Sequence, residues 1–353
     1  MKILHVTAAL GGGVATAIGD YLASTPSFEH WLLGTGPPEL HQCVRGLNGE
    51  MIPLPTGHFA RGRAVHHWVK TLKPDLVHAH SSYAGLYTRL LPLPGSTPTV
   101  YTPHCYGFER TDLGLPTRLF LWSLEAALSW RGGLVAAASA REARLAARLP
   151  GRIRIVRVPP TFRGEGSMQI RPREDSPSEL CEVVMVGRAC PQKDPGTFAA
   201  AAKIARASGS RTKWTWVGSG SSPSLQRLLN EAGVTVTGWL PREDVLKYVA
   251  RAGVYVHTAA WEAGVPLALL EAANAGLPVL ARNISAMSDL KICLFENARQ
   301  LADLVSAACI SGPMRAQMVE RSIQLAQDYP PKRQEEALRK AYELAARGSY
   351  RNA

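Results

Sequence analysis

Arg188 and Lys193 are two closely spaced cations in the second half of the chain. They follow the apolar run 182–186, typical of a buried strand, and precede a segment with helical spacing at 195–207. An arginine donates a fork of hydrogen bonds, a lysine offers a compact charge, and the positive end of a helix dipole adds to both. The loop therefore suits a diphosphate, although isolated basic residues are more often solvated surface.

Glu271 is a lone carboxylate in the apolar, helix-like segment 267–275. A carboxylate buried there is costly unless it accepts strong hydrogen bonds, which the hydroxyl groups of a ribose could supply. The alternative is a carboxylate at the helix edge that reaches water. The preceding turn, 264–267, offers backbone N–H groups that could hold sugar hydroxyls.

Gly11, Gly12 and Gly13 separate a strand-like run at 3–8 from a helix-like segment at 14–22. Without side chains they let backbone N–H groups approach a phosphate or a sugar at the positive helix end. Tight packing of a strand against a helix would require glycine just as well. The glycine turn alone leaves both interpretations open.

Strand-like and helix-like runs alternate along the chain, which indicates parallel sheets with helices on both faces. In such sheets ligands lie beyond the carboxyl ends of the strands, where the motifs above occur. Further strands are expected at 76–79, 99–102, 182–186, 213–217, 234–237, 254–258 and 278–281, and further helices at 63–72, 85–91, 195–207, 224–231, 244–250 and 267–275.

The length of 353 residues exceeds what one core usually organises, so we expect two domains. An N-terminal domain at 1–161 is followed by a polar linker at 162–179 and a C-terminal domain at 180–328. The remaining residues, 329–353, are expected to form a helical tail that packs back on the N-terminal domain.

Composition and charge narrow the function classes. The chain is 46% hydrophobic and 19% charged, and its longest apolar runs are too short to span a membrane. The first residues enter a strand without the pattern of a signal peptide, so we expect a cytoplasmic protein. The scattered cysteines are expected to be free thiols. They are Cys43, Cys105, Cys181, Cys190, Cys293 and Cys309.

A formal net charge of +12 indicates an anionic partner: a phosphorylated donor, an anionic lipid surface or a nucleic acid. Arg141, Arg144 and Arg148 recur at helical spacing and could dock on such a surface, although a solvated charged face is the commoner explanation. Peripheral association with an anionic membrane or a polyanion is therefore a hypothesis.

The motifs occur in an order that resembles glycosyltransferase family 4, a retaining group with the GT-B fold, over nearly the whole chain. The resemblance implies an α/β protein of two facing Rossmann-like domains with an interdomain cleft, which transfers a sugar from a nucleotide diphosphate sugar, here a UDP-sugar, without a cofactor. The acceptor stays open between a glycan, a lipid-linked sugar, a small molecule and a nucleic acid. The segments that carry it are 12–14, 77–82, 100–104, 187–193, 217–220, 237–238 and 271–279.

Carried over position by position, the resemblance makes Arg188 and Lys193 a diphosphate clamp and Glu271 a ribose ligand, and it places His104 beside the transferred sugar. His78 and His80 are expected to pack or to order a loop. The implied catalytic residues are His104, Arg188, Lys193 and Glu262. The implied donor-binding residues are Gly12, Gly13, Gly187, Arg188, Lys193, Gly218, Leu240, Gly264, Val265, Pro266, Leu267 and Glu271.

One position departs from the family pattern. The family carries two glutamates with seven residues between them, but Ala263 stands at the first position and Glu262 lies one residue earlier. Either the loop shifts to present Glu262, or the sugar-binding carboxylate is absent and Glu262 faces solvent. A nucleotide-sugar 2-epimerase and an inactive nucleotide-sugar binder are the rival interpretations. The sequence has no Asp-x-Asp, so a metal-dependent transferase loses support and no metal site is expected.

Overall fold

The computed structural model describes residues 1–36, 44, 46–164, 181–220, 222–310 and 312–348. The chain forms two compact units, which are described separately. The N-terminal unit comprises Met1–Thr161 and Pro331–Ala353, and the C-terminal unit comprises Phe162–Pro330. The expected linker lies outside the described residues except for 162–164, where Phe162 packs in the core of the C-terminal unit. None of the helices in the described ranges is long and apolar enough to cross a membrane.

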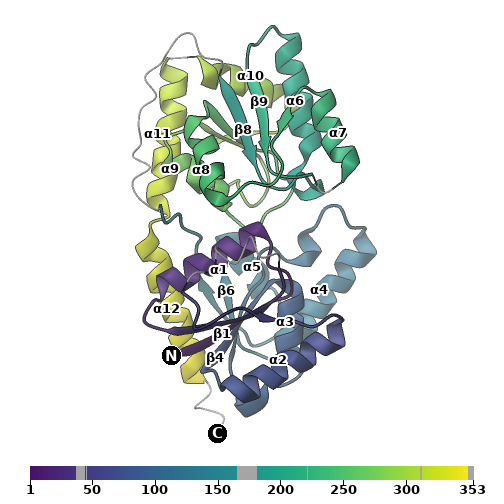
Figure 1. Ribbon diagram of the computed structural model, residues 1–353, viewed down its shortest axis with the longest axis vertical. Coiled ribbons are helices and arrows are strands. Elements are labelled where there is room, and N and C mark those ends of the chain that lie inside the picture. The colour runs from purple at the N-terminus through teal and green to yellow at the C-terminus, as the bar shows by residue number, and fades with distance from the viewer. Residues whose placement is uncertain (37–43, 45, 165–180, 221, 311, 349–353) are drawn as a thin grey trace. The chain divides into compact units, whose positions relative to one another are not determined.

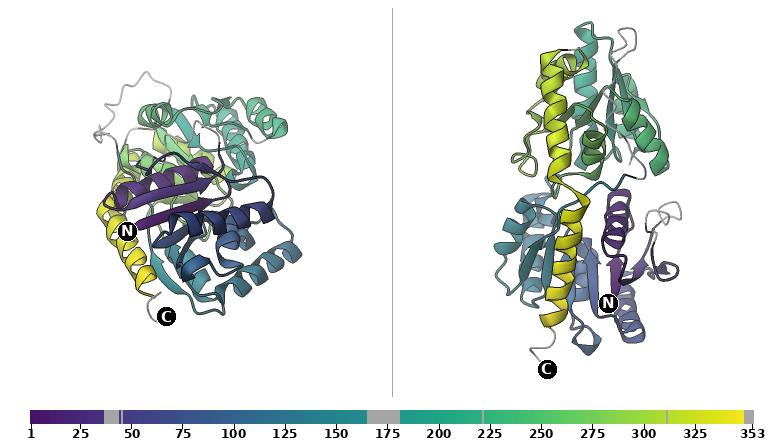
Figure 2. Two further views of the ribbon diagram at one scale, coloured as in Figure 1. Left: turned by 60° about the horizontal axis from the view of Figure 1, so that its bottom comes forward. Right: turned by 90° about the vertical axis from the view of Figure 1, so that its left-hand side faces the viewer.

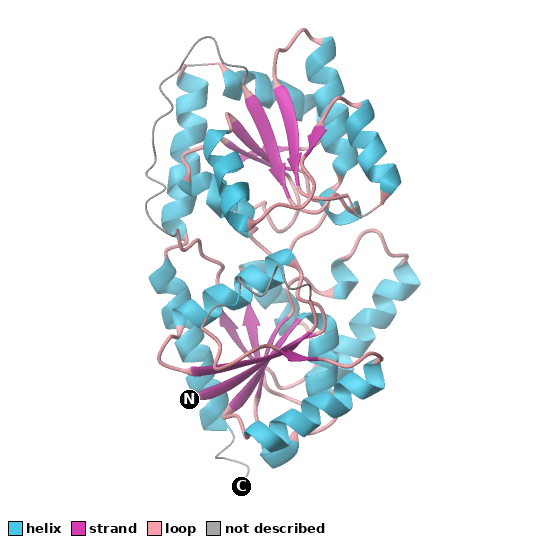
Figure 3. Cartoon of the chain, viewed as in Figure 1, coloured by secondary structure: helices cyan, strands magenta, loops and turns pink. Residues whose placement is uncertain are grey.

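The N-terminal unit is built on a parallel sheet of seven strands in the order β3-β2-β1-β4-β5-β6-β7 (Figures 1 and 3). Helices cover both faces of this sheet, which is why several of its strands read as apolar runs in the sequence. The seven strands are β1 (Lys2–Thr7), β2 (Glu29–Gly34), β3 (Ile52–Pro53), β4 (Leu76–His80), β5 (Thr99–Thr102), β6 (Leu134–Ala137) and β7 (Arg154–Arg157).

Successive side chains of a strand point to opposite faces of this sheet. Leu4 and Val6 pack in a core with residues of α2 (His58–Leu72), α3 (Ser81–Arg89), α4 (Leu115–Ser129) and α5 (Ala140–Ala147). Ile3 points the other way and packs with residues of α1 (Gly12–Ser24) and α12 (Pro331–Gly348). The C-terminal helix therefore completes the core of the N-terminal unit, and Figure 2 shows it in yellow.

The C-terminal unit has a parallel sheet of six strands in the order β10-β9-β8-β11-β12-β13. The strands are β8 (Glu182–Val186), β9 (Lys213–Val217), β10 (Thr235–Val236), β11 (Val254–His257), β12 (Val279–Arg282) and β13 (Cys293–Phe295). Residues of α6 (Pro195–Ala207), α7 (Pro223–Glu231) and α10 (Ala298–Cys309) share one core. Residues of α8 (Arg242–Arg251) and α9 (Leu267–Asn274) share the other, and α11 (Pro313–Asp328) contributes to both.

The expectation that all cysteines are free thiols is wrong for two of them. Cys181, just before β8, and Cys309, at the end of α10, form a disulfide across a sequence separation of 128 residues. Their Cα atoms lie 5.7 Å apart because β8 and α10 belong to the same packed core. Cys105, Cys190 and Cys293 form no disulfide, and Cys43 lies outside the described residues.

Candidate active site

Two glycines join the loops that follow β8 and β9. Gly187 N–H donates to the carbonyl of Val217 at 3.0 Å, and the indole N–H of Trp216 donates to the carbonyl of Gly187 at 2.7 Å. Gly218 has φ +145°, and a Cβ at this position would lie 2.2 Å from the Gly187 oxygen. No side chain fits there, so Gly218 is a structural requirement of the loop that carries Arg188.

Arg188 and Lys193, the two expected clamp residues, have different surroundings. Arg188 is exposed, whereas the Lys193 side chain is only 18% exposed. The Lys193 ammonium forms an ion pair with Oε1 of Glu262, whose side chain is 12% exposed. Of the two alternatives for this position, a Glu262 that faces solvent is excluded, because the turn after β11 directs the carboxylate toward the loop after β8.

Glu262 accepts hydrogen bonds from several elements. Its Oε1 also lies 3.1 Å from Nε2 of His257, the last residue of β11, and its Oε2 accepts from the amide of Gln192 at 3.4 Å. Burial raises the pKa of Glu262, but Lys193 and the His257 hydrogen bond outweigh it and lower the pKa to about 2. The carboxylate is thus a fixed negative charge next to the lysine.

Asp194 and Arg282 are two further residues of this loop region that sequence reasoning missed. Asp194 precedes α6 and caps it, because Oδ1 accepts from Thr197 N–H at 3.1 Å and Oδ2 accepts from the Thr197 hydroxyl at 2.7 Å. Arg282, at the end of β12, donates to Asp194 Oδ2 at 2.5 Å. The Asp-Pro-x-Thr pattern at 194–197 is the signal that could have revealed the cap.

Glu271 lies in α9 and is 3% exposed. Its Oε1 pairs with Arg242 of α8 at 2.8 Å. Burial raises the pKa of Glu271, and the Arg242 ion pair opposes that shift. The cost of burying the carboxylate is therefore offset by an arginine that the sequence did not single out, and the second Glu271 oxygen remains a hydrogen-bond acceptor.

The turn 264–267 leads into α9, which begins at Leu267. Pro266 is the N-cap, and no side chain caps the helix. Val265 is 7% exposed and packs in the core, so only its backbone could contact a ligand. Gly264 is buried, and Leu240 is half-buried in the loop before α8.

In the N-terminal unit α1 begins directly at Gly12, with Gly11 as N-cap and no side-chain cap. A Cβ built at Gly13 would meet no atom within 4 Å, and Gly13 has a φ open to any residue. Contacts among the described residues therefore give no reason why position 13 should be glycine rather than a larger residue. Open space beside an uncapped helix N-terminus fits the approach of a ligand instead.

His104 stands in the loop after β5 with φ +50°, and the next residue, Cys105, has φ +82°. A carboxylate joins this turn to the residue after β6. Glu142 of α5 accepts from the backbone N–H of Cys105 at 3.1 Å and from that of Ala138 at 2.7 Å. Burial lowers the pKa of His104 to about 4, so its imidazole is neutral at pH 7.

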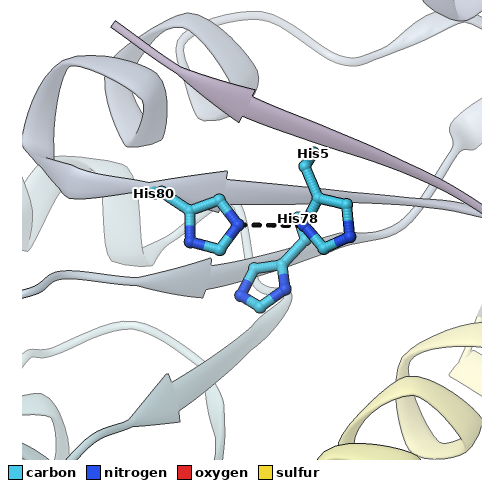
Figure 4. A group of neighbouring side chains, drawn as sticks. All are labelled: His5, His78 and His80. Carbon is cyan, nitrogen blue, oxygen red and sulfur yellow. Dashed lines mark hydrogen bonds between the residues drawn. The ribbon is translucent and has the colours of Figure 1, made fainter. Parts of the chain in front are cut away.

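Three buried histidines lie together on the α1 and α12 side of the sheet, as Figure 4 shows for His5, His78 and His80. Their ring nitrogens come within 4.8 Å of one another, a spacing that could hold a metal ion. Each of these nitrogens already has a hydrogen-bond partner. His78 contacts the Tyr342 hydroxyl and the Thr102 hydroxyl, and His5 and His80 contact histidines. The cluster is thus a hydrogen-bonded network, which agrees with the expected packing and loop-ordering roles.

Two domain families match the chain. Residues 12–161 match the glycosyl transferase 4-like domain, and residues 181–309 match the family described as glycosyl transferases group 1. The two matches lie in the N-terminal and C-terminal units, respectively.

Two curated relatives are similar in sequence. An uncharacterized 41.2 kDa protein in the cps region of Klebsiella pneumoniae is 22% identical over 341 residues, which cover 88% of this chain and 90% of that protein. The UDP-Gal:α-D-GlcNAc-diphosphoundecaprenol α-1,3-galactosyltransferase of Escherichia coli is 27% identical over 246 residues, which cover 65% of this chain and 62% of that enzyme.

Solved structures share the fold. Anabaena Alr3699/HepE in complex with UDP-glucose has a TM-score of 0.77 at 17% identity, covering 98% of this chain and all of that one. Sucrose-phosphate synthase from Thermosynechococcus elongatus has a TM-score of 0.67 at 18% identity, covering 99% of this chain and 97% of the other. The chain is a glycosyltransferase with the GT-B fold, built from a glycosyl transferase 4-like domain and a glycosyl transferases group 1 domain.

Proposed function

We propose that this glycosyltransferase moves a sugar from a UDP-sugar to an acceptor hydroxyl with retention of the anomeric configuration and without a metal ion. The observation that carries the proposal is the cationic loop after β8, which is fixed to the β9 loop through Gly187 and Gly218. An exposed arginine on such a rigid loop can bind a diphosphate with little loss of conformational entropy.

Arg188 and Lys193 stabilise the negative charge that develops on the departing diphosphate, the role that a cation plays in metal-dependent transferases. Because Glu262 partly neutralises Lys193, the exposed guanidinium of Arg188 supplies the larger share of the attraction. Glu262 holds the lysine in place and, on the same turn as the backbone N–H groups of 264–267, accepts hydrogen bonds from sugar hydroxyls.

Glu271 accepts hydrogen bonds from the ribose hydroxyls, while its Oε1 pairs with Arg242. Gly13 leaves room for the donor at the N-terminus of α1, where the helix dipole favours a negatively charged group. His104 presents a neutral imidazole to the transferred sugar.

A lipid-linked sugar is the acceptor class that we propose. The E. coli relative is named for a diphosphoundecaprenol-linked acceptor. The N-terminal unit of this chain exposes several large apolar side chains on α4, and their spacing places Leu115, Leu119 and Trp122 on one helix face. Exposed apolar side chains of this size on one helix suit the surface of a lipid bilayer.

The test is a nucleotide and donor screen followed by a transfer assay. UDP should stabilise the protein against heat more than ADP or GDP does, and one UDP-sugar should label a diphospholipid-linked GlcNAc acceptor in the presence of EDTA. Loss of transfer with EDTA, restored by Mg²⁺ or Mn²⁺, would contradict metal independence. A protein that binds a UDP-sugar but transfers it to no acceptor would be an inactive binder. Epimerisation of the UDP-sugar in the absence of an acceptor would favour an epimerase.

A further inference from the structure

Four histidine rings form one continuous line of hydrogen bonds that ends at His104. His104 Nε2 lies 3.1 Å from His80 Nδ1, and His80 Nε2 lies 3.0 Å from His5 Nδ1. The line continues from His5 Nε2 to His30 Nδ1 at 3.1 Å, and His30 Nε2 lies 3.0 Å from the carbonyl oxygen of Thr25. The bond between His5 and His80 is the dashed line in Figure 4.

The register of the sheet explains why these rings meet. His5 of β1 pairs with His78 of β4, and Thr7 pairs with His80, so His5 and His80 are diagonal neighbours on the same face. His30 is the register partner of Ile3 on β2, on the other side of β1. His104 follows β5, the strand next to β4.

The carbonyl of Thr25 gives the line a direction. A carbonyl oxygen only accepts, so His30 carries its hydrogen on Nε2. The Thr25 hydroxyl, 3.2 Å from the same nitrogen, also acts as an acceptor, because it donates its own hydrogen to the Tyr21 carbonyl at 2.9 Å. A neutral His30 then has an unprotonated Nδ1, which accepts from His5 Nε2–H. Each neutral ring has one donor and one acceptor nitrogen. His5 Nδ1 therefore accepts from His80 Nε2–H, and His80 Nδ1 accepts from His104 Nε2–H. All four rings are therefore Nε2–H tautomers.

The opposite direction would place two acceptors together, the Thr25 oxygen and an unprotonated His30 Nε2. Burial supports the neutral form of every ring, because it lowers the pKa of His5, His30, His80 and His104. The phenol groups of Tyr21 and Tyr342 and the Thr102 hydroxyl line the same network. Both phenol pKa values are raised, so no negative charge from these groups favours an imidazolium.

We propose that His5, His30 and His80 are positioning residues, which fix His104 as the Nε2–H tautomer and leave its Nδ1 as a hydrogen-bond acceptor for a hydroxyl of the donor sugar. This inference rests on the proposed function for its ligand, but the tautomer itself is a property of the free protein. Because His104 is held in one tautomer, no free energy is spent on converting it when the sugar binds. The acceptor nitrogen also selects against sugars that present no hydroxyl at that position.

The first test is the ¹⁵N spectrum of the free full-length protein labelled on histidine, with the His104 signals assigned by a His104→Gln variant. The expected result is an unprotonated Nδ1 and a protonated Nε2 for all four rings at pH 7.5. A protonated Nδ1 on His104, or an imidazolium, would overturn the proposal whether or not the enzyme is active.

The second test interrupts the line at His5. His5→Leu should leave His104 in a mixture of tautomers and raise the donor KM about tenfold, the cost of one hydrogen bond of about 1.4 kcal/mol, while UDP affinity stays unchanged. In His5→Gln the side chain can still accept from His80 and donate to His30, so it should keep both the His104 signal and the KM. His67→Leu, at an exposed position of α2, is the matched control.

An unchanged His104 spectrum in His5→Leu would overturn the positioning role. If His5→Leu does not fold, His30→Leu at the end of the line gives the same readout. A wild-type protein with the expected tautomers that transfers no sugar from any nucleotide would leave the tautomer assignment intact and overturn only the proposed function.

Discussion

The side chains of Lys193 and Glu262 form an ion pair although 69 residues separate them in sequence. Lys193 follows β8 and Glu262 follows β11, and these strands are neighbours in the parallel sheet. Their carboxyl ends meet at one edge, so the two loops lie together. The one-residue displacement of the glutamate from the family pattern therefore still leaves a carboxylate beside the expected clamp lysine.

Glu262→Ala should destabilise the C-terminal unit by about 1–3 kcal/mol, because it leaves a half-buried Lys193 without its partner. Donor affinity should fall as well, since the lysine is no longer held. Glu262→Gln keeps the size of the side chain and one acceptor oxygen, so its loss of stability should be smaller. Urea unfolding and donor titration measure both, and an unchanged Glu262→Ala protein would contradict the ion pair.

The histidine cluster should make the N-terminal unit sensitive to acid. The folded-state pKa values of His5, His78 and His80 lie well below 6.5, and that of His104 is about 4. Between these values and 6.5 the unfolded chain binds protons that the folded chain does not, so the free energy of unfolding falls as pH decreases from about 6.5 toward 4.

Glu142 opposes this trend, because burial raises its pKa to about 7 and its protonation stabilises the fold as pH falls through that value. Burial also raises the pKa of Glu109, which adds to this opposing effect. Two carboxyls do not offset the four histidines, so the net change is a loss of stability. His78→Gln should flatten the pH dependence of the urea midpoint, whereas His67→Gln on exposed α2 should not. A flat profile for the wild type between pH 6.5 and 4.5 would contradict buried neutral histidines.

Gly218→Ala should be among the most damaging small substitutions in the C-terminal unit. The new Cβ would lie 2.2 Å from the Gly187 oxygen at φ +145°. Gly209→Ala is the matched control, because φ is +78° there but no atom lies within 4 Å. We expect a loss of about 1 kcal/mol for Gly209→Ala and at least about 3 kcal/mol for Gly218→Ala, measured by thermal unfolding. Equal losses of stability in the two variants would show that the positive φ alone, and not the close contact with the Gly187 oxygen, requires glycine at position 218.

Gly13→Ala should separate folding from function. Alanine is the better helix former, by about 1 kcal/mol, so the variant should be as stable as the wild type or more stable. Its methyl group would occupy the open space at the start of α1, and the donor KM should rise at least about tenfold, a cost of about 1.4 kcal/mol. Gly62→Ala, in α2 with equally open surroundings, should stabilise without changing KM. An unchanged donor KM in Gly13→Ala would show that the donor does not bind at this turn.

The apolar face of α4 should bind lipid. Leu115 and Leu119 are 66% and 57% exposed, so a charge at either position should leave the fold intact. Leu115→Glu and Leu119→Glu should lose flotation with phosphatidylglycerol vesicles and transfer to a long-chain lipid acceptor, but keep transfer to a short, water-soluble analogue. Ile310→Glu, at a comparably exposed position of the C-terminal unit, is the control. Flotation that survives both α4 variants would contradict the lipid surface.

The sequence predicted most strands and helices of both sheets because parallel strands covered on both faces are continuous apolar runs. For the same reason it missed elements that lack such runs. β2 carries His30 and Trp31, and β3 and β13 are two and three residues long. Short edge strands depend on pairing with a neighbour more than on their own composition.

The sequence predicted the loops that follow β8 and β9, but not the side-chain pairings near them. Gly187 and Arg188 follow β8 and Gly218 follows β9, and these two strands are neighbours in the C-terminal sheet, so strand order alone brings their loops together. Neither the Arg242 partner of Glu271 nor the Cys181–Cys309 disulfide follows from spacing, because each joins elements whose proximity exists only after the sheet has formed. The line of histidines likewise depends on the register between β1, β2 and β4.

The position of α12 sets an unusual order for synthesis on the ribosome. Leu338, Ala341 and Tyr342 pack against Ile3 and its neighbours, and the Tyr342 hydroxyl contacts Nδ1 of His78. The strand β1 emerges from the exit tunnel long before α12, the helix that covers its face, because the whole C-terminal unit lies between them in the sequence. At about 5–20 residues per second, that face waits some tens of seconds for its cover. The C-terminal domain can finish folding during this interval, so the nascent chain completes its second domain before its first.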